Sequence, residues 1–207
     1  MIYLLDLFGT AVFAVTGSLA AGRKHMDLFG VVVIGLVTAL GGGTLRDLTL
    51  GADPVFWISD PTYIFVAATA SILTFAIARF REFPSGVLQV ADAFGLAIFT
   101  IIGAQKALGF GTAPVIAVIM GIMTGVVGGM IRDILSGEIP LILQREIYAT
   151  ASLSGAVMFV ALSRLTPNER LNISLAVLVT LGLRLAAIRW KLSLPVFPSM
   201  APKNHDR

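Results

Sequence analysis

Long apolar stretches separated by short polar connections dominate the chain. A helix that crosses the hydrocarbon core of a membrane needs about 20 mostly apolar residues. Seven stretches approach this length and are expected to extend into their flanks where they fall short. They are Ile2–Ala21, Leu28–Leu45, Thr62–Ala78, Val87–Gly103, Pro114–Ile131, Ile147–Leu162 and Leu171–Ile188. The pattern predicts an all-α membrane protein with seven transmembrane helices and no room for a soluble domain.

The composition supports this class of protein. Of the 207 residues, 57% are apolar and 13% are charged, whereas soluble domains carry about 25% charged residues. The net charge is only +3 and the longest basic run is Arg23-Lys24-His25, so nucleic acid is excluded as a partner. The absence of cysteine excludes disulfides, thiolate metal sites and cysteine catalysis.

The orientation follows from the distribution of basic residues. The first stretch lacks the positive start of a signal peptide and contains Asp6, so we expect it to remain in the mature protein. Cytoplasmic loops are enriched in Lys and Arg. With seven spans, 4 of the 15 basic residues fall on the side of the N-terminus and 11 on the other. The N-terminus is therefore predicted outside, and the tail of residues 191–207 cytoplasmic and flexible.

An internal repeat appears when the sequence is shifted along itself by 86 positions. Of the 49 aligned pairs from 6/92 to 54/140, 16 are identical. This is far above chance even for an apolar composition. The identities include Asp6 with Asp92, Thr38 with Thr124, Gly42-Gly43 with Gly128-Gly129, and Arg46-Asp47 with Arg132-Asp133.

The repeat predicts the domain organisation. Residues 1–83 and 84–165 form two units of three spans each, and residues 166–190 form a seventh helix outside the duplication. Because each unit has an odd number of spans, the second must enter the membrane from the opposite face. Inverted repeats of this kind are a transporter and channel architecture, with the pathway near their interface.

The glycine motifs Gly41-Gly42-Gly43 and Gly128-Gly129 allow two interpretations. Glycines spaced four apart, as at Gly35 and Gly121, permit close helix packing. Alternatively, consecutive glycines, each disfavoured in a helix by about 1 kcal/mol, produce a bend or unwound turn that lines a pathway. The recurrence of the motif in both halves, each time followed by an Arg-Asp pair, favours the pathway.

The pairs Arg46-Asp47 and Arg132-Asp133 also have two interpretations. They could be interfacial residues that end their helices, with the arginines reaching the headgroups. However, charges inside a span are costly and are functional candidates by default. Neighbouring side chains on a helix point about 100° apart, so we expect each residue to pair across helices and to act as a pore charge or gate.

Asp6 and Asp92 occupy equivalent positions near the starts of their spans. Either they are helix-start carboxylates favoured by the helix dipole, or they form acidic vestibules at the two mouths of a path. Thr38 and Thr124 could offer hydroxyl oxygens to a cation, or bond back to their own helices.

Four aromatic residues fall at predicted span ends. They are Trp57, Tyr63, Tyr148 and Trp190. Aromatic residues are enriched at membrane interfaces. We therefore expect these four to belong to aromatic belts and assign them no role in the pathway.

These motifs make the chain similar to the prokaryotic branch of the trimeric intracellular cation channel (TRIC) family, over about residues 2–190. The features that carry the resemblance are two three-helix units, a seventh helix, and the sequences Gly-Gly-Gly-Thr-Leu-Arg-Asp and Gly-Gly-Met-Ile-Arg-Asp. Such a glycine stretch is weak evidence alone. Its occurrence twice, in register, is specific.

The resemblance implies a homotrimer in the cell membrane of a prokaryote, with one potassium-permeable pore in each protomer. That pore would be lined mainly by helices one, two, four and five and bent at Gly41–Gly43 and Gly128–Gly129. Val127 replaces the first glycine of the second motif, so the two bends need not be equal. Arg46 and Arg132 are the nearest matches to basic residues that bind phosphoinositide in animal members, but that lipid specificity is not carried over.

We therefore expect a monovalent cation channel, with a secondary transporter of glycine or another small amino acid as the alternative. The same sequence domain is described as a glycine transporter in some bacterial relatives. An enzyme is disfavoured because His25 and His205, in a loop and the tail, cannot form an intramembrane Ser-His site. No cofactor or resident metal is expected. The expected partners are further copies of the chain, membrane lipids and permeant monovalent cations such as transient K+.

Overall fold

The computed structural model describes residues 2–193 except residues 82, 85, 145 and 146. The predicted flexible tail lies outside these residues apart from its first three positions. The described helices are α1 Ile2–Arg23, α2 Leu28–Leu50, α3 Phe56–Ser59, α4 Thr62–Ala78, α5 Val87–Gly109, α6 Pro114–Leu135, the 3-10 helix η1 Leu141–Leu143, α7 Ala149–Leu165 and α8 Glu169–Trp190.

Each of the seven predicted stretches is a helix, which confirms the all-helical class. The helices α1, α2, α5, α6 and α8 have 22 or 23 residues and are apolar enough to cross a membrane, whereas α4 and α7 are apolar but have only 17 residues. Several helices continue past their predicted ends. As a result, Arg46, Asp47 and Lys106 lie within helices instead of in connections.

Local signals explain where α2 and α6 begin and end. The Asp27 side chain accepts a hydrogen bond from the Gly30 N–H, which caps the start of α2. Pro114 begins α6, where its missing N–H costs nothing. Gly51 and Gly137 follow these helices with φ angles of 69° and 68°, a left-handed conformation that glycine adopts readily. The short helices α3 and η1, which were not predicted, follow these two turns.

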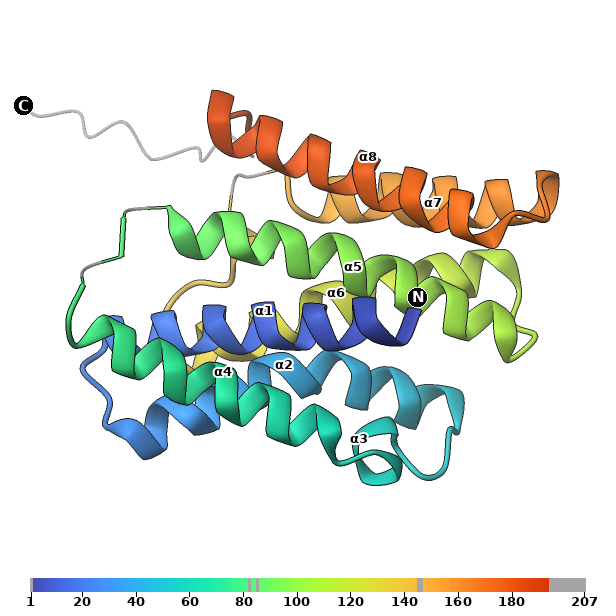
Figure 1. The fold of residues 1–207 in the computed structure, drawn as a ribbon. Coiled ribbons are helices and arrows are strands. Elements are labelled where there is room, and N and C mark those ends of the chain that lie inside the picture. The colour runs from blue at the N-terminus through green and yellow to red at the C-terminus, as the bar shows by residue number, and fades with distance from the viewer. Residues whose placement is uncertain (1, 82, 85, 145–146, 194–207) are drawn as a thin grey trace, which may run out of the picture.

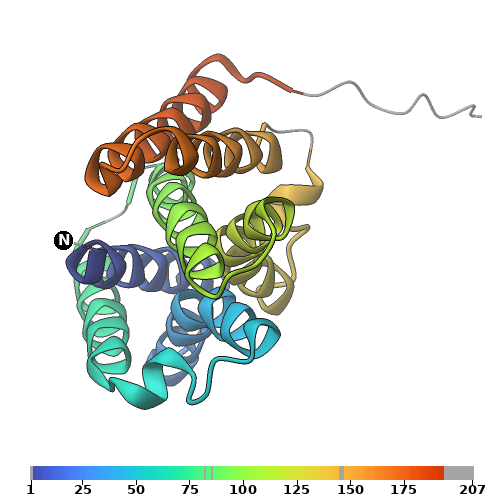
Figure 2. The same cartoon turned by 90° about the vertical axis from the view of Figure 1, so that its right-hand side faces the viewer.

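The helices form a bundle around two central members (Figures 1 and 2). The helices α1 and α5 run antiparallel beside each other. On one side α2 and α4 pack against α1, and on the other side α7 and α8 pack against α5. The helix α6 contacts α2, α5 and α7. This arrangement brings α1, α2, α5 and α6, which carry the predicted site residues, into one group.

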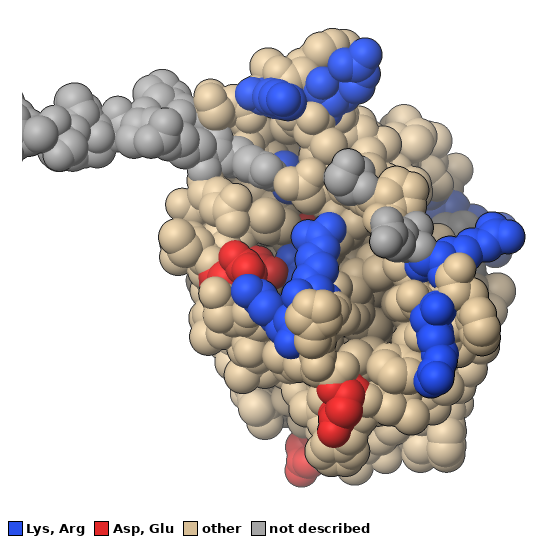
Figure 3. All heavy atoms as spheres, turned by 90° about the vertical axis from the view of Figure 1, so that its left-hand side faces the viewer, with Lys and Arg blue, Asp and Glu red and all other residues tan. Residues whose placement is uncertain are grey.

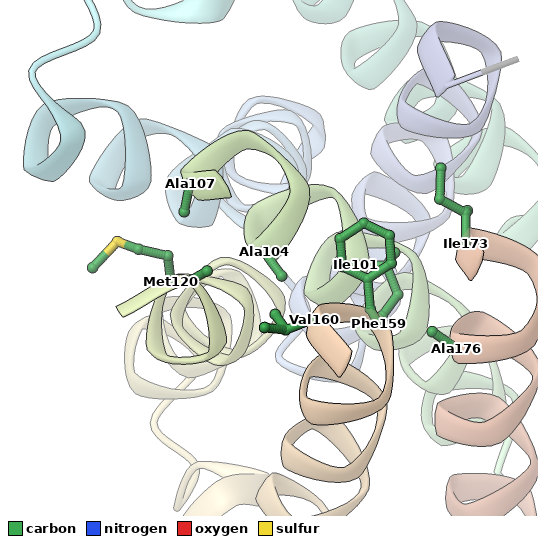
Figure 4. Close-up of a cluster of buried hydrophobic side chains, with 9 residues drawn as sticks. Ile101, Ala104, Ala107, Met120, Phe159, Val160, Ile173 and Ala176 are labelled. Atoms are coloured by element: carbon green, nitrogen blue, oxygen red, sulfur yellow. The ribbon is translucent and has the colours of Figure 1, made fainter. Parts of the chain in front are cut away.

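The interior of the bundle is built largely from small residues. One cluster joins four helices: Ile101, Ala104 and Ala107 of α5, Ala117 and Met120 of α6, Phe159 and Val160 of α7, and Ile173 and Ala176 of α8 (Figure 4). Alanine lets helix backbones approach closely, as in other membrane bundles. The core therefore holds α7 and α8 firmly against the central helix α5.

Candidate functional site

The glycine motifs lie where α2 crosses α6. A Cβ atom on Gly42 would lie 2.2 Å from the backbone oxygen of Thr124, and one on Gly128 would lie 2.3 Å from the backbone oxygen of Thr38. Any side chain at either position would therefore clash with backbone. The contact is reciprocal, because Gly128 and Thr38 are the repeat equivalents of Gly42 and Thr124.

The other two glycines of the first motif have different surroundings. A Cβ on Gly41 would meet only the tip of the Ile131 side chain, at 3.0 Å, whereas one on Gly43 would lie 2.7 Å from the Phe56 ring. The close-packing interpretation therefore applies most strictly to Gly42. Gly129 faces the second of the charged clusters described below.

The expectation of an unwound turn at these motifs is wrong. The helices α2 and α6 continue without interruption through Gly41–Gly43 and residues 127–129. The intrinsic penalty of about 1 kcal/mol for each glycine is offset because the absent side chains let the two helices pack against each other.

Thr38 and Thr124 lie at the same crossing and are buried. Their hydroxyls donate to the carbonyls of Ile34 and Met120, both at 2.6 Å. Of the two alternatives considered above, the structure has the bond back to the same helix.

The Arg-Asp pairs are neutralised differently from what was predicted. Arg46 Nε lies 2.7 Å from Asp47 Oδ1, and Arg132 Nε lies 2.8 Å from Asp133 Oδ1. Neighbouring residues therefore do pair, because the long arginine side chain folds back to the adjacent carboxylate. Pairing across helices, as predicted, also occurs, between Arg132 and Asp92 and between Asp47 and Lys106; the pairing of neighbours was not expected.

The second oxygen of each of these carboxylates holds the backbone beyond its helix. Asp47 Oδ2 accepts from the Phe56 N–H and Asp133 Oδ2 from the Leu141 N–H, both at 3.0 Å. These bonds pin α3 and η1 over the ends of α2 and α6. They also explain why the buried aspartates tolerate removal from water.

A first charged cluster consists of Asp6, Arg46, Asp47, Tyr63 and Lys106. Lys106 Nζ lies 2.8 Å from Asp47 Oδ1 and reaches it from α5. The Tyr63 hydroxyl donates to Asp6 Oδ2 at 2.9 Å. Sequence reasoning missed Lys106 because it placed the end of that span at Gly103, whereas α5 continues to Gly109.

A second charged cluster consists of Asp92, Arg132, Asp133 and Tyr148. Arg132 is fully buried, and its Nη1 donates to Asp92 Oδ1 at 2.7 Å and to the hydroxyl of Thr16 at 3.1 Å. Asp92 Oδ2 and Arg132 Nη2 have no hydrogen-bond partner within the described part of the chain. Buried polar atoms usually bind water where protein does not satisfy them, so this cluster offers polar atoms to water or to an ion.

Asp6 and Asp92 are not helix-start carboxylates. They are the fifth residue of α1 and the sixth of α5, and neither first turn contains an acidic residue. The dipole effect fades beyond the first turn, so it does not account for them. Because α1 and α5 are antiparallel, the two carboxylates lie toward opposite ends of the bundle (Figure 1).

The aromatic-belt expectation is wrong for both tyrosines. Tyr63 and Tyr148 are only 6% and 1% exposed. Each contacts an aspartate of its cluster, Tyr63 by the hydrogen bond to Asp6 and Tyr148 beside Asp92. The tyrosines are 85 residues apart, so the ungapped shift of 86 did not align them. Trp190 is 67% exposed, as a belt residue would be.

A cavity of about 390 Å³ leads from one end of the bundle toward the second cluster. Its lining includes Arg23, Lys24, Asp133, Ser136 and Glu138. Figure 3 shows basic side chains gathered around a hollow on this end of the molecule. At the rim, Lys24 pairs with Glu138 and holds the pKa of that carboxyl below its ordinary value.

Comparisons with known proteins agree with this architecture. A family model described as "Glycine transporter" matches residues 3–79 and 89–164. The inner membrane protein YadS of Escherichia coli is 50% identical over 95% of this chain and 96% of its own length. A membrane protein of Vibrio cholerae is 48% identical over 95% of this chain and 83% of its own length.

Solved structures of channels have the same fold. A structure described as the TRIC trimeric intracellular cation channel orthologue from Rhodobacter sphaeroides has a TM-score of 0.89 and 44% identity, over 92% of this chain and 98% of that one. A structure reported for conductance through TRIC cation channels has a TM-score of 0.87 and 39% identity, over 96% and 98%. The chain therefore belongs to the TRIC cation channel family, which the family model describes under the name of glycine transporter.

Proposed function

We propose that the chain is a monovalent cation channel, permeable to potassium, which assembles as a homotrimer with one pore in each protomer. The observation that carries this proposal is the likeness of nearly the whole fold to solved TRIC cation channels, with a TM-score of 0.89. A prokaryotic TRIC channel of similar fold was solved in 0.5 M KCl. The pore runs between α1, α2, α5 and α6 of a single protomer.

The two charged clusters give this path its selectivity. In the second cluster, Asp92 and Asp133 pair with Arg132 and Arg184 of α8 contacts the tyrosine, so the formal charges balance. In the first cluster, two carboxylates face Arg46 and Lys106, so the formal charges balance. Charges at membrane depth act strongly because little water screens them. The path therefore carries balanced charge at both ends, and its carboxylates offer oxygen atoms to a passing cation.

The two halves of the protein form inverted units of residues 1–83 and 84–165, with residues 166–190 as the seventh span. Reciprocal packing at Gly42 and Gly128, and matching Arg-Asp pairs, support a pseudo-two-fold relation. The helices α4 and α7 are short transmembrane helices. Their 17 residues reach about 26 Å at 1.5 Å per residue, slightly less than the hydrocarbon core of about 30 Å.

The glycine motifs are the places where the pore bends. Because α2 and α6 stay helical, the bend is a change of helix direction with the hydrogen bonds retained. Bending at Gly41–Gly43 would also move Arg46 and Asp47, which follow on the same helix. The motif thereby couples helix shape to the charge in the path.

The protein lies in the prokaryotic inner membrane, with the N-terminus outside and the C-terminus cytoplasmic. The E. coli relative is named an inner membrane protein, and the basic residues gather at the end that holds Arg23 and Lys24 (Figure 3). Membrane lipids surround the trimer, and anionic headgroups favour this basic end.

Reconstitution in planar bilayers under a potassium chloride gradient tests the proposal. Purified protein is expected to give unitary currents that reverse close to the potassium equilibrium potential. Protein heated until it unfolds serves as the negative control. Exchange of radiolabelled glycine across vesicles, without any resolvable current, would overturn the channel in favour of the amino-acid transporter.

A further inference from the structure

Arg184 brings a buried cation to the second charged cluster from α8, the helix outside the duplicated units. Its side chain is fully buried. Its guanidinium carbon lies 4.8 Å from the centroid of the Tyr148 ring, and its Nη1 donates to the Ile147 carbonyl at 3.4 Å. A guanidinium over an aromatic face is attracted to it, more strongly where water is excluded. Arg184 thus contacts the Tyr148 ring, which also packs against Leu96, Val126 and Leu141.

The hydroxyl end of Tyr148 reaches the charges of the cluster. It lies beside Asp92, next to Gly129. A Cβ on Gly129 would lie 3.2 Å from the Tyr148 hydroxyl, 3.3 Å from Asp92 Oδ1 and 3.5 Å from Arg132 Nη2. The three polar groups therefore meet around the glycine motif of α6, and continuous contacts lead from Arg184 through Tyr148 to Asp92 and Arg132.

The first cluster holds its tyrosine in another way. The Tyr63 ring packs edge-on against Phe56 and Tyr3, with centroid separations of 4.8 and 6.1 Å. These neighbours are uncharged and come from the first unit itself. In the second cluster a cation from α8 contacts the corresponding tyrosine, so the two ends of the bundle differ because of the seventh helix.

We infer that Arg184 is a positioning residue of the pore, which fixes Tyr148 so that Asp92 stays against Arg132. This inference rests on the proposed channel function. Without Arg184, the ring loses its cation contact and the Tyr148 hydroxyl leaves Asp92. Asp92 then compensates the charge of Arg132 less well, and cations crossing this end of the path meet greater repulsion. The seventh helix thereby sets the charge geometry of a pathway that it does not line.

Single-channel recording tests this role with matched variants. Arg184→Gln is expected to lower the unitary potassium conductance severalfold, and Arg184→Lys to restore part of it. Tyr148→Phe keeps the ring but removes the hydroxyl, so it should reproduce the loss. The double variant should be no worse than either single variant, because both act through one contact chain. Arg189→Gln, on an exposed part of the same helix, is the control and should conduct normally.

Fluorine NMR tests the contact chain without relying on conduction. The chain has three tyrosines, so fluorotyrosine labelling gives three signals, and Tyr148→Phe identifies the one from residue 148. Arg184→Gln should shift that signal, whereas Arg189→Gln should not. An unchanged signal in a folded Arg184→Gln protein, or additive losses of conductance in the double variant, would overturn the inference. If the wild-type protein does not conduct but Arg184→Gln still shifts the signal of residue 148, the proposed function is rejected and the positioning contact stands.

Discussion

Gly42 of α2 packs directly on the backbone carbonyl of Thr124 of α6, where a single Cβ atom would approach the oxygen to 2.2 Å. The same contact recurs between Gly128 and Thr38. A backbone oxygen cannot rotate aside as a side chain can. The packing of α2 against α6 therefore depends on one glycine from each half.

Gly42→Ala is predicted to destabilise the protein by about 1–3 kcal/mol, the usual cost of overpacking a tight interior. Gly41→Ala is the matched control, because its new methyl would meet only the flexible tip of Ile131 and alanine favours the helix. Chemical unfolding in detergent micelles measures both. Equal stabilities of the two variants would contradict the crossing geometry.

Asp47→Asn is predicted to reduce potassium conductance about tenfold, and more than Asp133→Asn does. It leaves Arg46 and Lys106 opposite Asp6 alone, so the first cluster gains a net positive charge. A unit charge 4 Å from an ion contributes about 4 kcal/mol at an effective dielectric constant of 20, and water reduces this further. Unitary currents in bilayers measure the effect.

Asp27→Asn provides the control for these aspartate variants. Asp27 lies in the α1–α2 connection and caps α2 through Gly30, a role that asparagine performs equally well. Its conductance should equal that of the wild type. If the Asp47 and Asp133 variants also conduct normally, these carboxylates only hold α3 and η1 in place.

The apolar pattern predicted the helices because membrane burial demands length and hydrophobicity at each span. Asp27 and Pro114, a cap and a first-turn proline, also mark helix starts that a sequence reveals. The positions of charges inside the bundle could not be predicted in the same way. Whether Arg46 folds back to Asp47 depends on which neighbours, such as Lys106 and the Phe56 N–H, complete the site.

The glycines illustrate the same difference. The internal repeat identified a motif of adjacent glycines but could not say which of them contacts the backbone of the neighbouring helix. Only the helix crossing distinguishes Gly42 from Gly41. Tyr148 was overlooked for a related reason, because a tyrosine at a span end is typical of an interface and its burial depends on packing against Leu96, Val126 and Leu141.

The rim pair of Lys24 and Glu138 predicts a pH response. Lys24 holds the Glu138 pKa below its ordinary value of 4.5. A lowered pKa means that the pair persists at neutral pH and is lost only as pH falls through that lower value. Lys24→Met should raise the pKa toward 4.5. Carbon NMR titration of the Glu138 carboxyl, assigned with Glu138→Gln, measures the shift, and an unchanged midpoint would show that the two groups are independent.

Lys106→Met is predicted to raise potassium conductance and to weaken anion permeation, the opposite of Asp47→Asn. The variant removes the cation that reaches Asp47 from α5 and leaves Asp6, Arg46 and Asp47 with a net negative charge. Because salt screens such charges, the gain should be larger in dilute potassium chloride than near 1 M, where the Debye length is about 3 Å. Lys191→Met, beyond the end of α8, is the control. A Lys106→Met channel whose conductance falls, or does not depend on salt, would mean that Lys106 supports the fold of the first cluster instead of opposing cations in the path.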